Sequence, residues 1–111
     1  MDIVPIKGVT VAFYDGPVIA READANDAIG ACYGQEVDLI AIPVEKLVDD
    51  FFWLSTGLAG AILQKCTNYN QQVAIVGNIS AYTAKSAPLR DFVYESNKRG
   101  EIRFVATEAD L

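Results

Sequence analysis

Short apolar runs rich in β-branched residues alternate along this chain with segments whose apolar residues recur every three or four positions. Residues 37–42 and 72–77 are almost continuously apolar, and residues 9–14 are rich in β-branched and aromatic side chains. Such runs predict strands, and near-continuous apolar character suits strands that are covered on both faces. Strands that alternate with helices predict an α/β layer with a mostly parallel sheet.

Three segments place apolar residues at helical spacing: residues 22–33, 55–68 and 88–99. Asp24 can cap the first of them. Gly34 and Gly100 follow the first and the third, where a glycine commonly ends a helix. Pro88 stands at the start of the third, the position at which a helix best accepts proline. Residues 102–106 are again apolar and β-branched, and they predict a final strand.

The N-terminal part is predicted to form a hairpin. Asp15-Gly16 is a strong turn signal, so residues 17–20 are expected to return as a second strand beside residues 9–14. The proline-containing arm before Val9 is expected to add an edge strand.

Residues 45–52 mix polar and apolar side chains, and we expect one helical turn followed by an extended aromatic stretch. Phe51, Phe52 and Trp53 cannot all face inward in an extended chain, because its side chains alternate between the two faces. Phe52 or Trp53 is therefore expected to be partly exposed. Residues 78–85 are small and polar, and they predict a loop.

These elements follow the order strand, strand, helix, strand, helix, strand, helix, strand. The fold class we expect is a single α/β domain over residues 1–111. Its sheet is expected to be mostly parallel with four or five strands, an N-terminal hairpin and three or four helices.

The charge of the chain limits its partners. Fifteen acidic against nine basic residues give a net charge of −6, and the basic residues are scattered. Neutralising phosphates needs a cationic face, so we expect no nucleic-acid binding and no docking on anionic lipid. No apolar run reaches the ~20 residues of a membrane helix, and the N-terminus lacks the pattern of a signal peptide. We therefore expect a cytoplasmic protein.

Histidine is absent from the sequence, which removes the commonest general base and the commonest metal ligand. Cys32 and Cys66 lie in apolar helical segments and are expected to be buried as small hydrophobes. Neither cysteine has a histidine to activate it as a nucleophile. We expect no metal site, no cofactor and no catalytic residue.

The middle predicted helix opens with Ser55, Thr56 and Gly57, followed by Gly60, although a glycine inside a helix costs about 1 kcal/mol relative to alanine. One explanation is structural: Ser55 or Thr56 is the N-cap, and the glycines let the helix lie close to the sheet. The other is functional. A helix N-terminus offers unpaired N–H groups and partial positive charge, so an anion can approach the backbone of residues 56–58.

The turn Ser55-Thr56-Gly57-Leu58, between a buried strand and a helix that leads to another strand, resembles the STAS domain, the sulfate-transporter and anti-sigma-factor-antagonist fold. This resemblance implies the STAS-like architecture of a hairpin, a helix, a buried strand and a Ser-Thr-Gly-Leu turn that opens the next helix. In the STAS antagonist proteins an aspartate precedes the phosphorylated serine. Leu54 takes that place here, which argues against phosphorylation of Ser55 or Thr56.

A second resemblance rests on more of the chain. The sequence resembles the family of domain of unknown function 4180 at Phe51-Phe52, Leu54, Gly57-Leu58-Ala59-Gly60, Leu63-Gln64-Lys65, Asn68-Tyr69, Ala74-Ile75-Val76-Gly77, Leu89-Arg90-Asp91-Phe92 and Glu95-Ser96-Asn97. The resemblance implies a family but no activity.

The function we expect is that of a non-enzymatic module that binds a partner protein or a small anionic ligand. The expected binding residues are Ser55, Thr56, Gly57 and Gly60, with Arg90 and Tyr82 as outer candidates. A small enzyme that uses Tyr82, Lys85 and Ser86 is one alternative, and a homodimeric scaffold is another.

Overall fold

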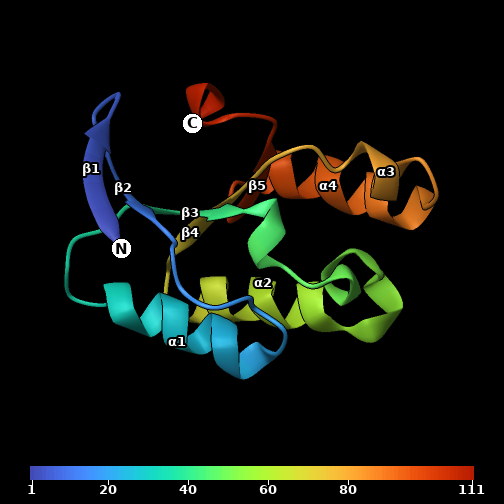
Figure 1. Cartoon of the computed structure of the whole chain (residues 1–111), viewed down its shortest axis with the longest axis horizontal. Coiled ribbons are helices and arrows are strands. Elements are labelled where there is room, and N and C mark those ends of the chain that lie inside the picture. Colours follow the sequence, from blue (N-terminus) through green and yellow to red (C-terminus); the bar gives the residue numbers. More distant parts are fainter.

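The computed structural model describes residues 1–111, in which five strands alternate with helices (Figure 1). The strands are β1 (Asp2–Ile6), β2 (Val9–Phe13), β3 (Leu39–Pro43), β4 (Gln72–Val76) and β5 (Ile102–Val105). The α-helices are α1 (Glu22–Cys32), α2 (Leu58–Asn68), α3 (Ser80–Thr83) and α4 (Ala87–Arg99). The short 3-10 helices are η1 (Val44–Lys46), η2 (Asp49–Phe52), η3 (Leu54–Thr56) and η4 (Glu108–Asp110).

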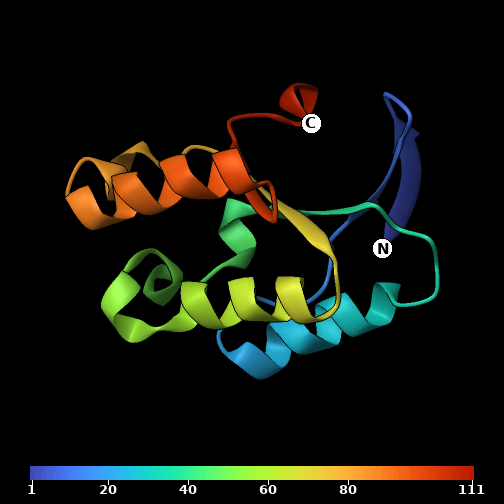
Figure 2. The same ribbon diagram turned by 180° about the vertical axis from the view of Figure 1, so that it is seen from behind.

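The five strands form one sheet in sequence order, β1-β2-β3-β4-β5. β1 and β2 are antiparallel, and the pairs from β2 to β5 are parallel. A parallel crossover is right-handed, so a chain that always adds its next strand on the same side places every crossover helix on the same face of the sheet. Figure 2 shows α1 and α2 side by side on one side of the sheet. The predicted fold class is confirmed at this level.

The helices pack on the sheet through one large buried cluster. On the sheet it includes Ile40, Ile42, Val73, Ile75 and Ile102, and on the helices it includes Ala25, Ala28, Ile29, Cys32, Leu58, Ala59, Ile62, Cys66 and Leu89. All three crossover helices therefore share one core. Both cysteines are free and buried within it, as predicted.

The opposite face of the sheet, which we call the second face, carries no α-helix. Its buried side chains are Val11, Leu39, Ala41 and Ala74. The C-terminal tail, residues 106–111, crosses this side, and Leu111 packs against these side chains. The apolar run of β3 is thus buried in both directions, which confirms the prediction that this strand is covered on both faces.

The hairpin lies one element earlier than the sequence analysis expected. β1 pairs with β2 through Lys7 and Gly8, whose φ values of 52° and 82° suit a two-residue hairpin turn. The expected edge strand before Val9 is therefore confirmed, and the expected strand at residues 17–20 is wrong. Because β1 and β3 occupy the two edges of β2, residues 17–20 have no edge to join; Ile19 makes only an isolated parallel bridge to Leu47.

Two further expectations are corrected. The aromatic stretch at the end of residues 45–52 is not extended, because residues 49–52 form the 3-10 helix η2. Residues 78–85 are not entirely a loop, since they contain the one-turn helix α3. There the side-chain oxygen of Asn78 accepts a hydrogen bond from the amide of Ser80 at 2.9 Å and orders the turn before α3.

The ends of α1 and α4 follow the predicted signals. The carboxylate of Asp24, in the first turn of α1, accepts hydrogen bonds from the amides of Ala20 and Arg21 at 3.0 and 3.1 Å. Ser86 caps α4 by accepting from the amide of Leu89 at 3.2 Å, and Gly100 ends α4 with φ 87°. The roles of Asp24 and Gly100 were predicted, because such signals are local in sequence, whereas the cap at Ser86 was not among the predictions. None of the helices has the length and apolar character needed to cross a bilayer.

The packing predicts different costs for one chemical change at two positions. Ile40 is 0% exposed in the helix-side core, whereas Ile3 on β1 is 41% exposed. We expect Ile40→Ala to lower the free energy of unfolding by about 3 kcal/mol, because it leaves a cavity, and Ile3→Ala to lower it by less than about 1 kcal/mol. Urea denaturation followed by circular dichroism measures both. Equal losses would contradict this description of the core.

Candidate functional site

The residues predicted around Ser55 lie where η2 and η3 lead the chain into α2. Adjacent residues of a 3-10 helix point about 120° apart, so two neighbours can both face the same side. Phe51 and Phe52 both enter the core, where each is 0% exposed, and Trp53 is turned outward and stays 39% exposed. The expectation that Phe52 or Trp53 is partly exposed is confirmed for Trp53.

Tyr82 of α3 packs against this segment. Its ring stacks on Phe52, with centroids 4.2 Å apart and planes 11° apart, and meets Trp53 edge to face at 6.3 Å. Its hydroxyl donates to Asp49 Oδ1 at 2.6 Å. This hydrogen bond, then burial and then the charge of Asp49 raise the pKa of Tyr82. We call residues 49–57, Gly60 and Tyr82 the Trp53 corner.

The start of α2 is built differently from the prediction. The N-cap is Gly57, in the left-handed conformation with φ 81°, and neither Ser55 nor Thr56 takes this position. The hydroxyl of Thr56 instead closes the preceding turns, since its oxygen lies 2.7 Å from the carbonyl oxygen of Asp50 and 2.9 Å from that of Trp53. The same oxygen accepts a long hydrogen bond, 3.4 Å, from the amide of Leu58.

The glycines of α2 are not needed for close packing. A Cβ at Gly57 or at Gly60 would meet no atom within 4 Å, so the structural explanation by packing against the sheet is wrong. Gly57 is explained by its positive φ, which side-chain-bearing residues adopt at a cost. Gly60 is exposed and helical, and nothing inside the molecule requires it. Like Ser55, Thr56 and Gly57, it is exposed.

A hollow of about 290 Å³ lies beside the start of α2, and its lining includes the side chains of Glu22 and Asp50. The amides of Thr56 and Gly57 donate to the carbonyls of Trp53 and Leu54 at 2.9 and 3.1 Å. The amide of Leu58 donates to the hydroxyl oxygen of Thr56. The backbone of residues 56–58, which we expected an anion to approach, is thus already bonded within the chain and stands next to carboxylates.

The outer candidates do not converge on one group. Arg90, at the start of α4, donates from Nη1 to the carbonyl of Thr83 at 2.6 Å and so joins α4 to α3. Tyr82 belongs to the Trp53 corner, whereas the guanidinium of Arg90 bonds to Thr83 at the C-terminal end of α3. Figure 1 shows the starts of α2, α3 and α4 at the same end of the molecule.

The residues of the alternative enzyme have structural partners or face solvent. Ser86 caps α4, Lys85 is exposed, and the hydroxyl of Tyr82 is held by Asp49. The raised pKa of Tyr82 opposes formation of the phenolate that a base would need.

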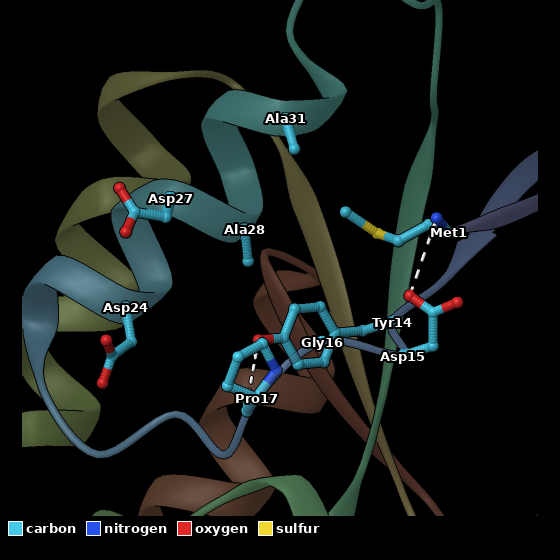
Figure 3. A pocket seen from close by; sticks show the side chains of 9 residues that line it. All are labelled: Met1, Tyr14, Asp15, Gly16, Pro17, Asp24, Asp27, Ala28 and Ala31. Carbon is cyan, nitrogen blue, oxygen red and sulfur yellow. Dashed lines mark hydrogen bonds and ion pairs between the residues drawn. The ribbon is translucent and has the colours of Figure 1, made fainter.

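A second hollow, of about 300 Å³, was not found by the sequence analysis. It lies between α1 and the N-terminal end of the hairpin, and Figure 3 shows Asp24 and Asp27 of α1 on one side and Asp15 beside Met1 on the other. The N-terminal amine lies 3.6 Å from Asp15 Oδ1. The spacing of Asp24 and Asp27, three residues apart on one helix, was the signal available in the sequence. No group of three acidic, histidine or cysteine side chains is arranged to hold a metal ion.

Tyr14 forms the floor of this acidic hollow. Burial, followed by the charges of Asp24, Asp15 and Asp27, raises the pKa of Tyr14, and its hydroxyl donates to the carbonyl of Pro17. The phenol is therefore held neutral by its surroundings.

Comparison with protein families gives one result. The family described as Domain of unknown function (DUF4180) matches residues 6–111. The match includes the residues between 51 and 97 that carry the resemblance, and it confirms the family that the sequence analysis predicted. Comparisons with curated proteins and with solved structures gave no match.

The two glycines of α2 predict stability changes of opposite sign. Gly57→Ala is expected to lower the free energy of unfolding by about 1 kcal/mol, because alanine is strained at positive φ. Gly60→Ala is expected to raise it by roughly 0.5–1 kcal/mol, because alanine is the better helix former and a Cβ meets nothing there. Chemical denaturation measures both, and a loss of stability in Gly60→Ala would refute the assignment of Gly60 as free of internal constraint.

The contact between Tyr82 and Asp49 predicts a pH effect. Because the pKa of Tyr82 is raised in the folded state, this contact stabilises the fold below about pH 10 and its contribution is lost as the pH rises through the pKa of Tyr82. Asp49→Asn is expected to lower the pKa of Tyr82 toward its ordinary value. Ultraviolet titration of tyrosinate in the two proteins measures the change. Tyr82→Phe identifies which step belongs to this residue among the five tyrosines.

Proposed function

The chain belongs to the family of domain of unknown function 4180, and because that description names no activity, we propose from the geometry a module that binds a partner protein through its Trp53 corner. The proposal includes the STAS-like architecture, which is supported by the parallel unit β3-α2-β4 and by Ser55-Thr56-Gly57-Leu58 at the start of α2. It also includes a cytoplasmic location, which is supported by two free, buried cysteines, since unpaired thiols suit a reducing compartment.

The observation that carries the proposal is the exposure of Trp53. It is the only tryptophan of the chain, and 39% of it is exposed beside the ring of Tyr82. Tryptophan and tyrosine are enriched in protein interfaces and dominate their energetics. Gly60, in the first turn of α2, is exposed and adds no side chain to this part of the surface. Together these features offer a rigid aromatic anchor beside a smooth helix surface.

The charges around the corner favour a protein partner over a small anion. Asp49 and Asp50 belong to the corner, and Glu22 lines the hollow beside it with Asp50. Lys65 lies 3.4 Å from Glu22 and compensates only that carboxylate. A net charge of −6 adds to the repulsion of anions. A partner that presents lysine or arginine side chains near an apolar patch complements this surface.

The alternatives have less support. The small enzyme requires an activated group, and Tyr82 and Ser86 are engaged in hydrogen bonds within the fold. The homodimeric scaffold does not use the Trp53 corner, and the second face of the sheet supports it.

The test places a photoreactive amino acid at position 55, beside Trp53, and irradiates cells that make the full chain. We expect protein adducts from this position and none from a matched probe at position 30. Gly30 is an exposed helix glycine whose Cβ would also meet nothing within 4 Å, but it lies on α1. Equal adduct patterns from the two positions would refute a partner surface at the corner.

Two variants then measure the role of the corner with the captured partner. Trp53→Ala is expected to weaken binding by about 30-fold, which corresponds to the ~2 kcal/mol of an interface hot spot. Gly60→Ala is expected to weaken binding although it raises stability, whereas Gly30→Ala raises stability without affecting binding. Titration of the Trp53 fluorescence follows the unaltered chain and both glycine variants, and isothermal calorimetry follows Trp53→Ala. Unchanged affinity in Trp53→Ala would remove the proposed anchor.

A further inference from the structure

The C-terminal tail lies over the second face of the sheet. The apolar side chains of this face are Val11, Leu39, Ala41 and Ala74, with Ile6, Phe13 and Val76 partly buried beside them. Leu111 packs on this cluster, and Lys7 Nζ donates to the carbonyl of Ala109 at 3.0 Å. Residues 106–110 are exposed, and both views show the tail on the side of the sheet opposite α1 and α2 (Figures 1 and 2). The tail is thus a thin second layer.

One row of side chains crosses the whole second face. The strand register joins Asp2 to Phe13, and it continues from Phe13 through Ala41 and Ala74 to Arg103. Residues opposite one another in register point to the same face of a sheet. The row therefore begins with an acid at one edge and ends with a base at the other. Between them stand one large aromatic side chain and two alanines.

This row is complementary to the same row of a second copy that runs in the opposite direction across the sheet. A two-fold axis that lies over β3, midway between the two sheets and parallel to the strands, places β1 of one copy over β5 of a second copy, and β2 over β4. Asp2 then faces Arg103 of the second copy, Phe13 faces Ala74, and Ala41 faces its own equivalent. Opposite charges meet at both edges, and the large side chain meets a small one.

The spacing of packed sheets suits these contacts. Sheets that pack face to face lie about 10 Å apart, a gap that an arginine and an aspartate span together. The twist of the sheet rotates the strands about the row and does not change the order of residues along it. The two rows, one from each copy, therefore remain complementary when the sheets are twisted.

Arg103 has no acceptor for its Nε within one copy of the chain. This atom is buried without a hydrogen-bond partner, and the three ion pairs of the chain join other residues. Buried donors are normally bonded, so an orphan of this kind needs an explanation. The carboxylate of Asp2, which is exposed in a single copy, supplies the missing acceptor when it comes from a second copy.

We propose that the second face binds a second copy of this chain and that the tail competes with that copy for the same surface. Leu111 packs on the buried side chains of this face, so two sheets cannot meet there until the tail leaves. The tail therefore keeps the chain monomeric, and its displacement permits the dimer. This surface is on the opposite side of the sheet from α2 and is separate from the Trp53 corner.

The test releases the tail in the full chain. Leu111→Asp replaces the apolar anchor by a charge, and we expect its dimer dissociation constant to be at least about tenfold lower than that of the unaltered chain. Lys7→Ala removes only the surface hydrogen bond to the tail and is expected to act in the same direction with a smaller effect. Sedimentation velocity over about a hundredfold range of concentration measures self-association, and circular dichroism checks that each variant is folded. If Leu111→Asp is not folded, the self-association of Lys7→Ala alone tests the proposal.

Charge variants distinguish the proposed geometry from non-specific association. In the Leu111→Asp chain, Arg103→Asp places two acids opposite each other and is expected to weaken the dimer by at least about tenfold. Adding Asp2→Arg restores opposite charges, and with them the dimer. The proposal is overturned if the folded tail variants associate no more than the unaltered chain, whether that chain is monomeric or dimeric. It is also overturned if neither charge change alters the dissociation constant of the dimer.

Discussion

A parallel sheet that carries apolar side chains on both faces must shield both faces from water, and this requirement shapes the whole molecule. The strands follow one another across the sheet, so every right-handed crossover falls on the same side. The helices α1, α2 and α4 therefore cover one face with a continuous core. The other face is left to the tail, a covering so thin that its removal exposes an apolar surface. The asymmetry between the two faces follows directly from the strand order.

The same strand order also means that the sheet lacks the crevice in which open α/β sheets usually bind ligands. Open α/β sheets bind ligands in the crevice where the strand order reverses, and the order β1-β2-β3-β4-β5 has no reversal. The features that distinguish the helix-start end of the molecule arise instead from local geometry. The 3-10 helices η2 and η3 turn two adjacent phenylalanines inward and Trp53 outward, which creates an aromatic corner without a deep cleft. A corner of this kind is better suited to a protein surface than to a small molecule.

The two hollows on the helix side of the molecule are both acidic. The hollow beside α2 and the hollow beside α1 are both lined by carboxylates. An acidic surface favours encounter with basic partners and opposes anions. On the second face the charges are arranged differently, with Asp2 and Arg103 at opposite ends of one row. We propose the first surface for a different protein and the second face for a copy of the same chain.

The sequence by itself determined most of the secondary structure, the α/β class and the family, because hydrophobic period and helix-end signals such as Asp24 and Gly100 are local properties of the chain. It also determined that one of the residues at positions 52 and 53 would be exposed. Only the tertiary structure decided that β1, and not residues 17–20, pairs with β2, because that outcome depends on which strand edges remain free. It alone distinguished Gly57, held by its backbone angle, from Gly60, which has no internal constraint. The acidic hollows and the row from Asp2 to Arg103 likewise arise from contacts between residues far apart in the chain, and no local pattern encodes the geometry of such contacts.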